Sequence, residues 1–186
     1  MVEWTQLLLP IVFSAVVVFV LSSLMHMVVK WHNGDYLKLP DEKGFNRVMR
    51  KEPLPPGQYI FPHCIDPKEA ASAAGIEKFQ QGPVGVMYVR PSGQMQLGPF
   101  LGKWMLFLVV VSVLVAYVAR MSLAAGADGG VVFRVTGVVA WLAYSFAGPA
   151  DSIWMGKPWP VTIKHMIDGL AYGLGTGAMF SWMWPA

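Results

Sequence analysis

The chain is 186 residues long, with 55% hydrophobic residues, 13% charged residues and a formal net charge of +3. Ordinary soluble domains carry roughly a quarter charged residues, so this chain has too few polar groups to cover a water-facing surface. The composition therefore excludes an ordinary soluble enzyme and indicates an integral membrane protein.

Hydrophobic residues gather into four blocks, near residues 7–29, 99–123, 131–150 and 162–184. A helix needs about 20 mostly apolar residues to cross the hydrocarbon core of a bilayer. The third block is the weakest, because Arg134 leaves a clean apolar run of only residues 135–146, which also suits a re-entrant segment. We predict an all-α membrane bundle of four transmembrane helices, with three spans as the alternative.

Lysine and arginine residues set the predicted orientation. Ten of them lie between the first two spans or at the edges of that segment, and two more precede or begin the fourth block, whereas the opposite side has only Arg120 and Arg134. Because the positively charged side of a membrane protein faces the cytoplasm, both termini are predicted on the outer side of the membrane and the long segment in the cytoplasm. The predicted division is residues 1–30 as the first span, 31–98 as a cytoplasmic insert and 99–186 as three further spans.

The insert has the pattern of a small α+β unit. A short helix is predicted after Pro40, a strand over residues 58–61, a second helix from Asp66 to about residue 80 and a second strand over residues 84–89. Elements this short bury little core. We therefore expect the insert to rest on the membrane, on the spans or on a partner.

Two histidines are candidate cofactor ligands. His26, near the end of the first span, and His165, near the start of the fourth, are predicted at the same membrane edge. A facing pair could ligate haem iron, and a single histidine could ligate a chlorophyll. The alternative is that both imidazoles only bond to headgroups or helix ends. No metal site is predicted at His63 and Cys64, because neighbouring strand residues point to opposite faces and no second cysteine exists.

Two charged residues near membrane depth are candidate proton or partner contacts. Asp168 is expensive to bury, but Lys164 and His165 precede it by one helical turn and offer local pairing. Arg134 is a similar candidate, with Asp128 or an acid of another subunit as its predicted partner.

The sharpest motif is a run of glycines at four-residue spacing, Gly169, Gly173 and Gly177. This spacing places small residues on one helix face, where another backbone can approach closely. We interpret it as a helix-packing face. No Walker loop, zinc-protease helix or esterase elbow is present, so the common ATPase, protease and esterase designs are disfavoured and no catalytic residue is predicted.

Four segments carry a resemblance to a known family: PGQYIFP at 56–62, GPVG at 82–85, DSIWMGKPW at 151–159 and DGL at 168–170. They resemble a family of small uncharacterised bacterial inner-membrane proteins. The resemblance implies a compact multi-span bundle with a cytoplasmic insert, and it implies no activity.

The leading functional hypothesis is a non-catalytic accessory or scaffold subunit of a larger inner-membrane complex, of an energy-converting type such as a photosynthetic or respiratory one. Other membrane subunits and lipids are the predicted partners, while nucleic acid and a small-molecule substrate are not predicted. The alternatives are a haem- or chlorophyll-binding redox protein that uses His26 and His165, and a transient assembly factor.

Overall fold

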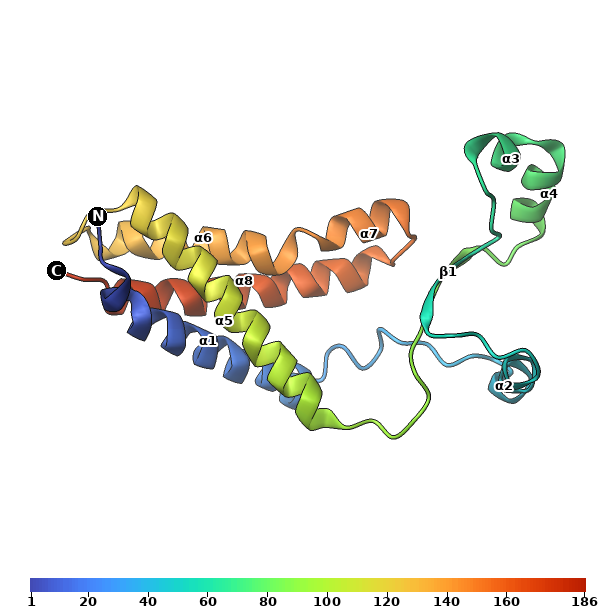
Figure 1. Ribbon diagram of the computed structural model, residues 1–186, viewed down its shortest axis with the longest axis horizontal. Helices are drawn as coiled ribbons and strands as arrows, with labels where there is room; N and C mark the ends of the chain where they lie inside the picture. The colour runs from blue at the N-terminus through green and yellow to red at the C-terminus, as the bar shows by residue number, and fades with distance from the viewer. The chain divides into compact units, whose positions relative to one another are not determined.

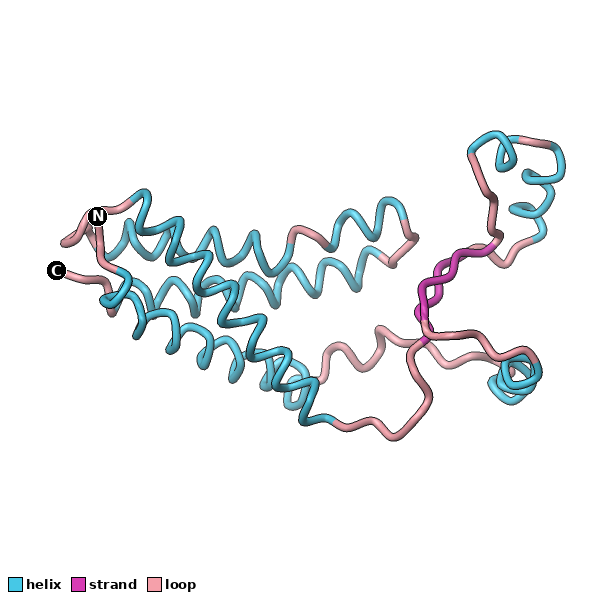
Figure 2. The backbone as a smooth tube through the Cα atoms, viewed as in Figure 1, coloured by secondary structure: helices cyan, strands magenta, loops and turns pink.

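The computed structural model describes all 186 residues and consists mostly of helices joined to one small sheet. Figure 1 and Figure 2 show the helices and the two strands. In chain order the elements are η1 (Trp4–Leu7), α1 (Leu8–Ser23), η2 (Leu24–Val29), α2 (Glu42–Lys51), β1 (Gly57–Phe61), α3 (Pro67–Ala71), α4 (Ala73–Gln81), β2 (Gly85–Val89), α5 (Leu97–Ser122), α6 (Gly129–Ser145), α7 (Gly148–Trp154) and α8 (Trp159–Trp182).

Three helical segments are long and apolar enough to cross a membrane: Trp4–Val29, Leu97–Ser122 and Gly129–Trp154. The third segment combines α6 and α7. The predicted third block, residues 131–150, therefore reaches membrane length because the short helix α7 follows α6. α8 has 24 residues, but its charged first turns and its glycines make it less apolar than the other three. The structure thus provides three membrane-length apolar helices.

The chain divides into two compact units. The first comprises Met1–Tyr36, Met95–Ser152 and Lys157–Ala186, and the second comprises Leu37–Gln94 with Ile153–Gly156. The predicted insert covers residues 31–98, whereas in this division residues 31–36 and 95–98 belong to the first unit. Within the first unit His32 bonds to Asp168 and Asp35 bonds to Lys164, and these long-range contacts carry no local sequence signal.

The first unit is a bundle of α1, α5, α6 and α8 (Figure 1). One apolar cluster includes Leu7, Val111 and Phe180, and a second includes Val18 and Leu108. Both termini lie at the same end of this bundle. There Arg120 Nε donates a hydrogen bond to the Val2 carbonyl at 2.6 Å, and the Gly126 amide donates to the Pro185 carbonyl at 2.8 Å.

The glycines of α8 lie against α6. A Cβ atom added at Gly173 would stand 2.7 Å from the Gly137 carbonyl oxygen, and one at Gly177 would stand 2.8 Å from the Phe133 carbonyl oxygen. At Gly169 it would meet the side chain of Ser145. The close approach that four-residue glycine spacing permits is thus made to a helix of the same chain.

The second unit contains the two predicted strands and the predicted helices. β1 and β2 pair antiparallel, from Gly57 opposite Val89 to Phe61 opposite Gly85. The helix expected from Asp66 to about residue 80 is split into α3 and α4, because the Ser72 hydroxyl accepts a hydrogen bond from the Gly75 amide and starts a new helix. Within Leu37–Gln94 only Gly75 is buried, so this unit has no hydrophobic core.

Candidate functional site

The candidate site lies where the end of the first membrane-length helix meets α8. Here α1 continues into η2, a π-helical stretch that carries His26. Lys30 then adopts a left-handed conformation, with φ of 56°, and ends the helix. Two tight turns follow, in which the Asn33 amide bonds to the Lys30 carbonyl and the Asp35 amide to the His32 carbonyl. The reversal of the chain brings residues 31–36 against α8.

His32 is held between two carboxylates. Its Nδ1 lies 2.7 Å from Asp35 Oδ2, and its Nε2 lies 2.6 Å from Asp168 Oδ2. The side chains of Asp35 and Asp168 are 6% and 3% exposed, so both acids are almost removed from solvent. Because an ionised carboxylate only accepts hydrogen bonds, both ring nitrogens of His32 donate when both acids are charged, and the ring is then an imidazolium.

Lys164 completes this charged network. Its ammonium donates to Asp35 Oδ1 at 2.5 Å and to the Trp31 carbonyl at 2.8 Å. These contacts place two carboxylates beside one ammonium group and the ring of His32. The hydrogen bond from Lys164, followed by that from His32, holds the pKa of Asp35 below its usual value.

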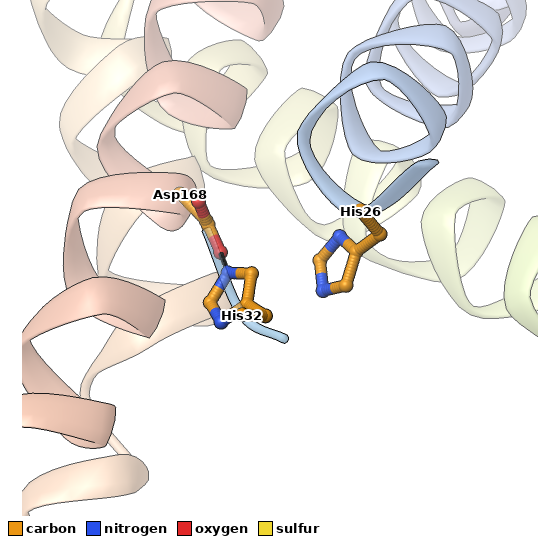
Figure 3. A group of neighbouring side chains, drawn as sticks. All are labelled: His26, His32 and Asp168. Atoms are coloured by element: carbon orange, nitrogen blue, oxygen red, sulfur yellow. Dashed lines mark hydrogen bonds and ion pairs between the residues drawn. The ribbon is translucent and has the colours of Figure 1, made fainter. Parts of the chain in front are cut away.

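Three imidazole rings gather at the site. The ring of His26 stacks on that of His32 with centroids 4.7 Å apart, and the ring of His32 stacks on that of His165 with centroids 5.1 Å apart. His26 Nδ1 donates to the Ser22 carbonyl at 3.0 Å, which leaves Nε2 with a free lone pair. Figure 3 shows His26 beside His32, whose Nε2 points at Asp168.

One polar atom of the site has no partner. Asp168 is 2% exposed, yet its Oδ1 accepts no hydrogen bond. A buried acceptor without a donor costs about 1–3 kcal/mol, and more when it is charged. This atom therefore needs a water or a cation beside it.

The arrangement offers ligand atoms for a metal. One atom from each of His26, His32 and Asp168 lies within 4.8 Å of the other two. Imidazole nitrogen and carboxylate oxygen are ligands that divalent transition metals accept.

The predicted local pairing of Asp168 is replaced by a distant one. Lys164 bonds to Asp35 and not to Asp168, whose hydrogen-bonded partner is His32. At the other candidate, no ion pair joins Arg134 to Asp128, and the Asp128 carboxylate instead caps α6 by accepting a hydrogen bond from the Val131 amide. Arg134 is exposed on α6 and lines a groove together with Trp141.

Haem or chlorophyll ligation by His26 and His165 stays a prediction. In the structure the rings of both residues already contact His32, which that prediction did not include. No family model, curated protein or solved structure matches the chain. The resemblance to small inner-membrane proteins thus remains an expectation.

Sequence reasoning missed His32 and Asp35 as site residues. The available signal was the gathering of three of the four histidines, His26, His32 and His165, at one predicted membrane edge. No local pattern distinguishes Asp35 from the other charged residues of the hydrophilic segment, so the sequence offers no reason to predict it as a site residue.

Proposed function

We propose that this chain is a non-catalytic subunit of a larger assembly in the bacterial inner membrane, with an insert that binds a partner. The observation that carries the proposal is the lack of a core in Leu37–Gln94, where only Gly75 is buried. A segment that buries so little apolar surface gains too little to offset the entropy of ordering its chain. Contact with another protein supplies the missing burial.

Exposed apolar side chains in the insert support this proposal. Leu37, Val48, Ile65 and Tyr88 are 91%, 65%, 86% and 65% exposed. Apolar residues of this size are enriched where a protein surface becomes buried in a complex. The exposed Arg134 adds a cation on the bundle that an acidic group of another subunit would pair.

The proposal includes α8 as a fourth span. Its 24 residues extend about 36 Å at a rise of about 1.5 Å per residue, enough for the hydrocarbon core. The charges that lower its apolarity are Lys164 and Asp168, and both have polar partners within the bundle. Four spans and twelve of the fourteen basic residues on one side support an insert in the cytoplasm and both termini outside.

The test is isolation of the chain from its native membrane in a mild detergent, followed by native mass measurement and identification of bound proteins. We expect the chain to migrate with other integral membrane subunits in fixed stoichiometry. Recovery of a lone chain under mild extraction would contradict the proposal, and substoichiometric, transient association would instead identify an assembly factor.

A matched pair of variants tests the role of the insert. The combined substitutions Val48→Ser, Ile65→Ser and Tyr88→Ser remove exposed apolar surface and should therefore release the partner. Because all three side chains are exposed, the substitutions remove no buried contact within the chain. The control combines Lys43→Ser with Lys68→Ser, which are exposed charges of the same insert. Loss of the complex in the control alone would show that charge, and not apolar contact, holds the insert.

A further inference from the structure

The His26, His32 and Asp168 cluster is not needed by the proposed subunit role. We propose that these three residues bind one divalent transition-metal ion of the Zn²⁺ type at the end of the bundle, in a site that orders the junction between η2, residues 31–36 and α8. The inference goes beyond the proposed function, because a partner-binding subunit requires no metal.

The separations of the ligand atoms suit an ion after a small movement. Zinc binds imidazole nitrogen and carboxylate oxygen at about 2.0–2.2 Å, so ligand atoms around a tetrahedral ion lie about 3.4 Å apart. The three atoms now lie within 4.8 Å of one another. To close the longest gap, the exposed ring of His26 must turn out of its stack on the ring of His32.

Between His32 and Asp168 the ion replaces a proton. The 2.6 Å separation of Nε2 and Oδ2 is that of a short hydrogen bond and is too small for two ligands of one ion. On binding, the Nε2 proton leaves to solvent, the nitrogen lone pair and a carboxylate oxygen face the ion, and the two side chains separate.

The outer contacts of both histidines already match those of metal ligands. A ligating histidine usually donates its other ring N–H to a carboxylate or a backbone carbonyl, which fixes the tautomer and the ring orientation. His26 Nδ1 donates to the Ser22 carbonyl at 3.0 Å, and His32 Nδ1 donates to Asp35 Oδ2 at 2.7 Å. In both rings Nε2 is therefore the atom left for the ion, and Lys164 holds the supporting Asp35 in place.

The unpartnered oxygen of Asp168 points independently to a cation. Asp168 is 2% exposed and its Oδ1 has no donor in the protein. An ion at the cluster would take over from the His32 ring the compensation of this buried carboxylate, which is expensive to keep charged without a cationic partner. Three protein ligands leave a fourth position for water, as in open zinc sites.

Zinc binding to the purified full-length protein tests the inference. The protein, in detergent micelles, is stripped with a chelator, dialysed against Zn²⁺ and analysed for metal per chain, and its affinity is measured by competition with a zinc indicator. We expect one ion per chain. Because His26 is exposed, His26→Ala removes a ligand without opening the His32–Asp168 contact, and it should weaken binding at least about tenfold.

His63→Ala is the matched control, since His63 is outside the cluster. It should bind Zn²⁺ as the wild-type protein does, and Zn²⁺ should raise the Tm of the wild-type protein and of this control more than that of His26→Ala. Equal affinity of His26→Ala and the wild-type protein, or no zinc retained by the wild-type protein, would overturn the inference. The measurement uses the isolated chain, so it fails or succeeds separately from partner binding.

Discussion

His32→Ala should lower the free energy of unfolding of the bundle by about 3–5 kcal/mol, the cost of removing one partner from a buried ion pair. The ring is the hydrogen-bonded partner of Asp168 Oδ2, at 2.6 Å, and it also bonds to Asp35 Oδ2, at 2.7 Å. Without it Asp168 keeps a nearly inaccessible carboxylate with no donor, because Oδ1 is already unpartnered. Unfolding in detergent, followed by circular dichroism in metal-free buffer, measures the loss.

His26→Ala is the control for this variant. His26 is exposed and its hydrogen bond is to a carbonyl of its own helix, so its removal in metal-free buffer should cost much less. A second variant, His32→Leu with Asp168→Leu, removes both partners together and should recover much of the stability, since a buried pair replaced by apolar side chains is often close to neutral. Equal stability of His32→Ala and the wild-type protein would show that the contact contributes nothing.

Gly173→Ala should destabilise the bundle by about 1–3 kcal/mol through overpacking. The added methyl group would stand 2.7 Å from the Gly137 carbonyl oxygen and 3.0 Å from Trp141 Cβ. The first of these atoms belongs to the backbone of α6 and cannot rotate away, so α6 and α8 must separate. Thermal or detergent-induced unfolding of the purified chain measures the change.

Gly102→Ala provides the comparison. Gly102 lies in α5, and a Cβ atom there would meet nothing within 4 Å. Both substitutions gain the same helix propensity, about 1 kcal/mol in favour of alanine, so the difference between the two variants isolates the steric term. Similar stability of the two variants would contradict close packing of α8 on α6.

The elements most open to prediction were those with a local signal. Residues 7–29 and 99–123 contain long apolar runs, and the corresponding helices are Trp4–Val29 and Leu97–Ser122. Both strands of the insert were predicted from their β-branched and aromatic residues, and they pair as β1 and β2. The division of the second insert helix at Ser72 was not predicted, because a serine inside a helical pattern becomes an N-cap only when the chain bends there.

The glycine spacing in α8 predicts a packing face but does not identify the helix that packs on it. Gly169, Gly173 and Gly177 share one helix face because a helix repeats every 3.6 residues, and this follows from the sequence alone. The sequence does not say which helix packs against that face. The structure brings α6 to it, so these glycines are covered within the chain and offer no surface to another subunit.

The sequence by itself determined which segments are apolar helices and where charge is concentrated, because both follow from residues close together in the chain. Only the tertiary structure decided the partners of the ionisable groups. Lys164 lies one turn from Asp168 and yet bonds to Asp35, while Asp168 bonds to His32, 136 residues away. Such pairing depends on the left-handed turn at Lys30 and on the docking of residues 31–36 against α8, and a buried carboxylate takes whichever donor that packing brings to it.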